Sequence, residues 1–175
     1  MAGATGTGSD ILPAMAGLHI RAAAEPDVPL IATLIRELAE YERLLDSVSM
    51  TEERLRSALF SPHRYAEVAI AEDDTGEALG FALFFHNFST FLGLPGIYLE
   101  DLFVRPAHRG LGVGRALLQH LARVARDRNC GRLEWSVLDW NETAIGFYRR
   151  LGAQPNDGWT VYRLEGEALA LLAAP

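Results

Sequence analysis

Three glycines at alternating positions, Gly110, Gly112 and Gly114, follow Arg109 where an apolar run gives way to an amphipathic segment. A strand that turns through glycines into a helix presents unpaired backbone N–H groups at the positive end of the helix dipole. The glycines let the backbone approach an anion closely, and Arg109 adds a charged donor. The order Arg-x-x-Gly-x-Gly therefore predicts a phosphate-binding loop rather than a simple connecting turn. It is neither a P-loop nor the GxGxxG dinucleotide fingerprint.

Two adjacent carboxylates, Glu100 and Asp101, lie inside the apolar run 97–104 that precedes this loop. In a regular strand they point to opposite faces, and Asp101 shares its face with Leu99 and Phe103. Carboxylates are costly to bury without partners, so at least one of the two is expected to face a polar pocket. Asp101 also has a structural alternative, in which it binds nearby backbone.

The composition narrows the classes of partner. The net charge is −7 and the sequence pI is about 5.2, which disfavours nucleic acid and suits a cationic substrate. The one cysteine, Cys130, is better explained as buried filler than as a nucleophile, and it favours a reducing cytoplasm. The five histidines lack metal-ligand spacing, and no apolar run approaches the ~20 residues that span a bilayer, so neither a metal nor a membrane is expected.

The elements that must position these residues follow from hydrophobic periodicity, N-caps and Pro/Gly signals. We expect a loose leader over 1–17 and one domain over 18–175. Its expected elements are strands over 18–21, 65–71, 78–86, 97–104, 132–138 and 159–164, and helices from Pro26, from Thr51, after Gly114, from Asn141 to Leu151 and over 165–172.

This order of elements predicts an α/β fold with a mixed, mostly antiparallel sheet and helices on both faces. The hairpin turn 73–77 indicates early antiparallel pairing, and the helix after Gly114 implies a parallel crossover. The stretch 87–96 is expected to be a loop. Its apolar side chains are explained equally well in two ways. They could form a pocket wall or a subunit contact, or the loop could fold onto its own core.

The motifs in this order resemble the GNAT superfamily of acyl-CoA-dependent N-acetyltransferases, from about Leu18 to Leu164. They are similar in particular to its spermidine/spermine and thialysine N-acetyltransferase branch. The segments that carry the resemblance are Glu37–Arg43, Tyr98–Asp101, Arg109–Gly114, Trp140–Glu142 and Phe147–Ala153. The family fold implied has a splayed parallel strand pair.

The resemblance implies transfer of an acetyl group from acetyl-CoA to a primary amine of a small molecule, by direct attack in a ternary complex. A polyamine or a thialysine-like amino acid would be the acceptor, and the enzyme would be a homodimer. Acetylation of a protein or peptide is one alternative. A non-catalytic acyl-CoA-binding module is the other, although the presence of both an acid and a base candidate disfavours it.

Tyr148 is the general acid that the resemblance implies, because a phenol with a reference pKa of ~10 can protonate a departing thiolate of ~8.5. Its alternative is an amphipathic core tyrosine beside Phe147. Glu100 is the corresponding base candidate. An aliphatic ammonium has a pKa of ~10, far above that of a carboxylate, so a single carboxylate cannot fully hold its proton. Glu100 would therefore act directly, through a water relay or only as a substrate positioner.

The resemblance also implies contact residues for both substrates. Instead of contacting the cofactor, Asn141 could serve only as the cap of its helix. Instead of binding the substrate, Glu37 could lie on a solvated helix face. The implied substrate-binding residues are Glu37, Tyr41, Glu100 and Asp101. The implied cofactor-binding residues are Leu102, Phe103, Val104, Arg109, Gly110, Leu111, Gly112, Val113, Gly114, Arg115, Asn141 and Tyr148.

Overall fold

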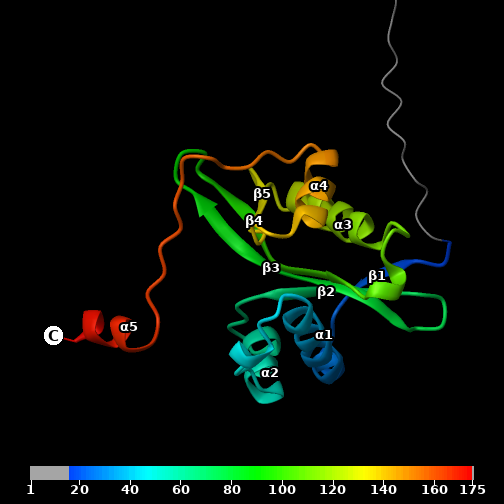
Figure 1. Cartoon of the computed structure of the whole chain (residues 1–175), viewed down its shortest axis with the longest axis horizontal. Coiled ribbons are helices and arrows are strands. Elements are labelled where there is room, and N and C mark those ends of the chain that lie inside the picture. Colours follow the sequence, from blue (N-terminus) through cyan, green and yellow to red (C-terminus); the bar gives the residue numbers. More distant parts are fainter. Residues whose placement is uncertain (1–15, 175) are drawn as a thin grey trace, which may run out of the picture. The chain divides into compact units, whose positions relative to one another are not determined.

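The computed structural model describes residues 16–174, in which five strands form one twisted sheet in the order β1-β2-β3-β4-β5 (Figure 1). Neighbouring strands pair antiparallel except β4 and β5, which pair parallel. This confirms the mixed, mostly antiparallel α/β sheet. The strands are β1 (His19–Ala22), β2 (Glu67–Glu72), β3 (Ala78–Ser89), β4 (Leu94–Val104) and β5 (Leu133–Trp135).

Helices cover both faces of the sheet, with α1 and α2 on one side and α3 on the other (Figure 1). The Thr51 side chain caps α2 by accepting the Arg54 N–H at 3.2 Å, as the sequence predicts. The helices of this part are α1 (Val28–Tyr41), α2 (Glu52–Phe60) and α3 (Val113–Asp127), with 3-10 turns over Glu25–Asp27, Leu45–Ser47 and Pro106–His108.

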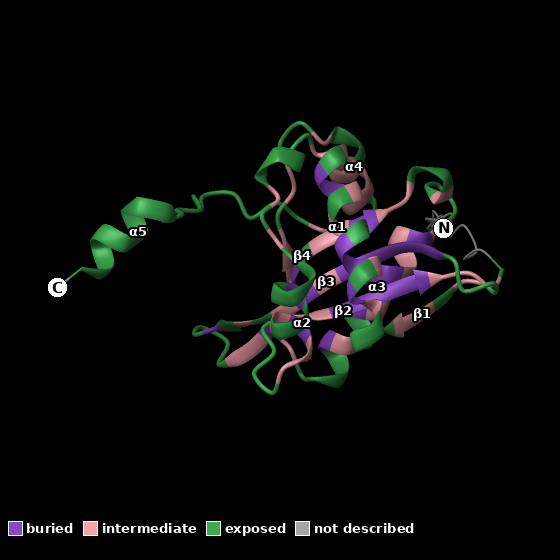
Figure 2. Ribbon diagram, turned by 90° about the horizontal axis from the view of Figure 1, so that it is seen from below, coloured by how far each residue is buried: buried purple, intermediate pink, exposed green. Residues whose placement is uncertain are grey.

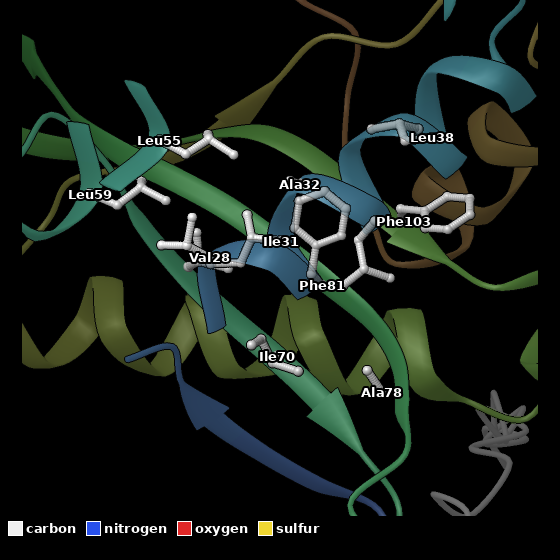
Figure 3. Close-up of a cluster of buried hydrophobic side chains, with 12 residues drawn as sticks. Val28, Ile31, Ala32, Leu38, Leu55, Leu59, Ile70, Ala78, Phe81 and Phe103 are labelled. Carbon is white, nitrogen blue, oxygen red and sulfur yellow. The ribbon is translucent and has the colours of Figure 1, made fainter. Parts of the chain in front are cut away.

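The main core lies between the sheet and the α1–α2 pair (Figure 3). Phe81 of β3 and Phe103 of β4 lie opposite each other and pack against the inner face of α1. Figure 2 shows the buried class running along the central strands and the inner helix faces. Because each fully buried side chain contributes about 1.5–3 kcal/mol, this cluster holds β4 firmly against α1.

A β-bulge interrupts β4 at Glu100. Asp101 pairs with Leu83 and Leu99 pairs with Phe84, so Glu100 has no partner on β3. Directly paired residues share a face, and Leu83 packs on the α1 side. Asp101 therefore faces α1 and Leu99 faces away from it. The expectation that these two residues share a face is wrong, because it assumed a regular strand.

The parallel pair is splayed, as the family resemblance implies. Pairing between β4 and β5 ends at Leu99 and Trp135, whereas β4 continues to Val104. On the β5 side, the last part of β4 has no neighbouring strand among the described residues. The backbone groups at this edge, here called the open edge of β4, must find other partners.

Several expected boundaries change. The stretch 87–96 is not a loop, because β3 and β4 continue through it as a paired hairpin whose connection is only 90–93. The strand over 132–138 shortens to β5. The strand over 159–164 does not form: this exposed segment has no strand partner within 16–174. The leader 1–17 lies almost wholly outside the described residues.

The chain divides into two compact units after Ser136, and the second is described by itself. It contains α4 (Glu142–Arg150) and α5 (Gly166–Ala173). Asn141 caps α4 by accepting the Ala144 N–H at 3.2 Å, and Gly152 follows the helix with a φ of +88°, so the predicted helix from Asn141 to Leu151 is confirmed. None of the helices in residues 16–174 is long and apolar enough to span a membrane.

Candidate active site

The glycine loop leads directly into the N-terminus of α3. Gly110 and Gly112 adopt φ values of +77° and +86°, a conformation that costs little only for glycine. No side chain caps this end of α3, and its first turn holds no acidic residue. The first N–H groups, those of Val113, Gly114 and Arg115, therefore point along the helix axis without an intrahelical acceptor. This arrangement suits an anion.

Arg115 adds a second observation at the same place. Its Nε atom is buried and has no hydrogen-bond partner among the described residues. A positive side chain in the first turn opposes the helix dipole, so the charge of Arg115 is unfavourable for α3 unless an anion lies there. Leu111, by contrast, exposes its side chain and offers only its backbone.

The open edge of β4 presents an alternating set of backbone groups. The Ile97 N–H donates to the carbonyl of Arg132 on the β5 side at 3.0 Å. The Arg105 N–H instead donates to the carbonyl of Leu79 in β3, at 2.9 Å. With the bulge between them, alternation turns the backbone groups of Leu102 and Val104 to the open edge. Phe103 differs, because its backbone faces β3 and its side chain is buried in the core.

Three carboxylates gather beside the bulge. Asp101 is partly buried on the α1 face, and burial, the nearby Glu100 charge and the nearby Glu42 charge together raise its pKa to about 7. Glu42 follows the last residue of α1, and burial raises the pKa of its carboxyl as well. Glu100 is exposed at the bulge. Such a group of negative charges favours a bound cation.

Glu37 has an intramolecular partner. Arg105 donates from Nε and Nη2 to the two carboxylate oxygens of Glu37, both at 2.9 Å, and from Nη1 to the Ala78 carbonyl at 2.8 Å. This bidentate pair ties α1 to the end of β4 and the start of β3. Glu37 is thus not a freely solvated helix residue, and a substrate amine would meet a carboxylate that Arg105 already neutralises.

Tyr41 and Arg109 contact each other. The Arg109 guanidinium carbon lies 4.2 Å from the centroid of the Tyr41 ring and 5.7 Å from that of Phe103. The Arg109 Nε donates to the Val104 carbonyl at 2.9 Å. The structure therefore joins a predicted substrate-binding residue to the first residue of the glycine loop.

The two remaining predicted residues lie in the second unit. Asn141 caps α4, and Tyr148 lies on α4 with its ring centroid 5.3 Å from that of Phe147. These contacts are compatible with a structural role for each residue, and they are also compatible with the chemical role that the sequence suggested for it.

Two features of the site were not predicted from the sequence. Arg105 follows β4 directly, but nothing local indicates that its partner is Glu37, which is far away along the chain. The bulge at Glu100 is also invisible, because one extra residue in an apolar run leaves no compositional trace. For Glu42 a weak signal existed, since it belongs to the acidic face of the α1 segment.

Comparisons with known proteins decide the family. The sequence model of the acetyltransferase (GNAT) family matches residues 31–153. The chain belongs to the GNAT acetyltransferase family. It is 42% identical to the thialysine N-epsilon-acetyltransferase of Bos taurus, over 91% of this chain and 99% of that protein. It is 34% identical to the L-ornithine N5-acetyltransferase of Arabidopsis thaliana, over 86% of each chain.

A solved structure agrees with this assignment. An integron cassette protein from the mobile metagenome of V. cholerae superposes with a TM-score of 0.76 at 32% identity, covering 91% of this GNAT chain and 99% of that one. The family resemblance drawn from the sequence is confirmed, and so is the enzyme class: the chain is an acetyl-CoA-dependent N-acetyltransferase. The unpaired helix N-terminus and the unpartnered Arg115 Nε fit the phosphate groups of that donor.

Proposed function

We propose that this enzyme acetylates the terminal primary amine of a small diamino acid of the thialysine or ornithine type, with polyamines as weaker acceptors. The observation that carries the proposal is the grouping of Asp101, Glu100 and Glu42 where the open edge of β4 begins. The similarity to enzymes named for thialysine and ornithine supports it. A cationic amine would neutralise this group of charges.

Within that group we assign the main contact with the amine to Asp101. Moving a proton from an ammonium of pKa ~10 to an ordinary carboxylate of pKa ~4 is uphill by about 8 kcal/mol. The same transfer to Asp101, with its pKa raised to about 7, is uphill by about half as much. Asp101 is therefore the better base, and Glu100 serves as the exposed positioner or the relay to solvent.

The acetyl donor is assigned to the glycine loop and the open edge. Backbone N–H groups from Gly110 to Arg115, together with the Arg115 side chain, would hold its phosphates, and the backbone of Leu102 and Val104 would pair with its pantetheine arm. The family resemblance assigns a contact with the same donor to Asn141. Tyr148 would protonate the leaving thiolate.

We also propose that the enzyme is a homodimer in the cytoplasm. The segment 159–164 has strand-like apolar residues that are strongly exposed, with Val161 at 84% and Tyr162 at 92%. Because the family resemblance implies a homodimer, we assign these apolar residues to the contact with a second copy. Analytical ultracentrifugation tests the dimer, with Val161→Asp expected to give monomers. The free Cys130 thiol suits a reducing compartment.

The experiment that tests the function is acetyl-CoA-dependent thiol release with purified enzyme. The acceptors are thialysine, ornithine, lysine, spermidine, spermine, putrescine and a short peptide with a free amino terminus. We expect the highest kcat/KM with a diamino acid. Asp101→Asn should lower that kcat/KM by about 100-fold, whereas Asp127→Asn, at the exposed end of α3, should leave it unchanged.

Turnover with the peptide alone would overturn the small-molecule assignment in favour of a protein acceptor. Binding of acetyl-CoA without turnover on any acceptor in the panel would overturn the proposed acceptor class. A higher kcat/KM with spermidine than with the diamino acids would move the assignment to polyamines.

A further inference from the structure

The side chain of Arg109 connects three parts of the site. Its guanidinium stacks on Tyr41 at 4.2 Å from the ring centroid, and its Nε donates to the Val104 carbonyl at 2.9 Å. Its own backbone begins the glycine loop. Within residues 16–174 it forms no ion pair with a carboxylate. The contacts that hold Arg109 are therefore an aromatic face and a carbonyl at the open edge.

The other ends of these contacts lie at the two substrate sites. Tyr41 is the last residue of α1, and Glu42, which follows it, is close enough to raise the pKa of Asp101. Val104 is the last residue of β4 and presents its carbonyl to the open edge. Whatever fixes Tyr41 relative to Val104 also fixes Glu42 relative to the bulge at Glu100.

We propose that Arg109 is a positioning residue, which holds the end of α1 against the open edge of β4 and so shapes the amine-binding wall. The inference rests on the proposed function, and it differs from the expected role of Arg109 as a phosphate ligand. Phosphate binding is left to the backbone of the loop and to Arg115. Arg109 then affects the acceptor amine more than the acetyl donor.

The chemistry of the side chain supports this role. A planar guanidinium can lay its face on an aromatic ring and donate a hydrogen bond in its own plane at the same time. A lysine ammonium is a compact point charge that cannot do both in one geometry. If Arg109 served only as a positive charge near phosphate, lysine would replace it well. If it serves as a connection between Tyr41 and Val104, lysine would not.

The first test is the kinetics of Arg109→Lys. We expect the KM for the preferred amine to rise by about fivefold or more, while the KM for acetyl-CoA and its salt dependence change less than about twofold. Arg123→Lys is the matched control, because Arg123 is exposed on α3 away from the loop. Its KM values should equal those of the unmodified enzyme. A merely structural loss would not separate the two KM values in this way.

The second test needs no turnover. A double-mutant cycle of Arg109→Gln and Tyr41→Leu, measured by urea unfolding of the free protein, isolates the coupling between these side chains, because glutamine removes the cation. We expect the effects on the unfolding equilibrium constant to be non-additive by about threefold or more, as an exposed cation–π contact provides. Calorimetry of acetyl-CoA binding to Arg109→Lys should show an affinity within about twofold of the unmodified protein.

The results that would overturn the proposal are distinct from those that would overturn the proposed function. Weaker acetyl-CoA binding by Arg109→Lys with an unchanged KM for the amine would make Arg109 a phosphate ligand. Additive effects in the cycle would remove the contact with Tyr41. An unmodified enzyme that acetylates no amine overturns the proposed function, and the cycle and the calorimetry still decide the role of Arg109.

Discussion

Leu99 and Asp101 lie on opposite faces of the sheet although they are two positions apart on β4, because Glu100 between them is bulged out of register. The bulge has two consequences for the chemistry. It turns Asp101 towards α1 and the Glu42 carboxylate, and it exposes Glu100. It also marks the point where β4 loses β5 as a neighbour. The bulge thus accounts for the arrangement of the carboxylates, and it places them where the open edge begins.

Asp101→Asn should stabilise the fold at high pH. The pKa of Asp101 is about 7 in the folded state and near ~3.9 in the unfolded state, so between these values the folded state binds more protons. Stability is therefore lost as the pH rises from ~4 to ~7, and the penalty is complete above pH ~7. We expect a gain of about 2–4 kcal/mol in unfolding free energy at pH 8, and little gain near pH 4.

Urea unfolding at both pH values measures this difference. Asp127→Asn is the control, because its carboxylate is exposed, with a side chain 63% accessible, and bonded to a neighbouring arginine. It should show no gain at either pH. An Asp101→Asn protein that is no more stable than the unmodified enzyme at pH 8 would mean that folding does not raise the pKa of the Asp101 carboxyl.

Tyr148→Phe should lower turnover by at least ~10-fold while leaving acetyl-CoA affinity almost unchanged. The change removes only the phenolic oxygen, so packing of the ring beside Phe147 is retained. Steady-state kinetics and calorimetry measure the two quantities. Tyr65→Phe, at a residue 79% exposed between α2 and β2, is the control and should behave as the unmodified enzyme. Near-normal turnover of Tyr148→Phe would remove this residue from proton transfer.

The parts of the site that depend on local signals were predictable from the sequence. The glycine loop before α3 and the Asn141 cap of α4 each need only a few neighbouring residues, whose types limit the backbone to few conformations. The same is true of the Thr51 cap. These are the elements whose positions the structure confirms most closely.

The parts that depend on distant contacts were not predictable. The Arg105–Glu37 pair and the Arg109–Tyr41 stack join segments that only the fold brings together. The residues over 159–164 favour a strand, yet none forms there, because a strand also needs a neighbour that offers hydrogen bonds. Among the described residues 16–174, the five strands of the sheet do not include that segment.

Gly110→Ala should weaken acetyl-CoA binding through the backbone. Gly110 has a φ of +77° and no atom within 4 Å of an added Cβ, so alanine would meet conformational strain rather than a clash. We expect a loss of about 1 kcal/mol in stability and an increase of about tenfold in the KM for acetyl-CoA, because the loop relaxes away from its anion-binding shape. Thermal unfolding and steady-state kinetics measure the two effects.

Gly76→Ala is a matched control for this change. Gly76 has a φ of +83° in the β2–β3 turn, and it also has no atom within 4 Å of an added Cβ. Its alanine variant should lose about the same stability, ~1 kcal/mol, without any change in KM. Equal KM values for the two variants would show that the conformation of the loop does not matter for the donor.

Arg43→Gly should stabilise the enzyme by about 0.5–1 kcal/mol. Arg43 has a φ of +62° after α1, where the Leu44 N–H donates to Ala39 at 2.8 Å and the Arg43 N–H to Glu40 at 3.1 Å. This is the Schellman arrangement, whose left-handed position glycine occupies without a Cβ clash. Chemical unfolding of the free protein measures the gain.

Asn129 occupies the corresponding position after α3 and provides the control. Its φ is +53°, and the Cys130 N–H donates to Ala125 at 2.8 Å in the same arrangement. Asparagine tolerates the left-handed region better than arginine does, so Asn129→Gly should gain less than about half as much as Arg43→Gly. An Arg43→Gly protein that is less stable than the unmodified enzyme would mean that the Arg43 side chain forms a compensating contact at the end of α1. That contact would then offset the backbone strain of Arg43 in the turn that also carries Glu42.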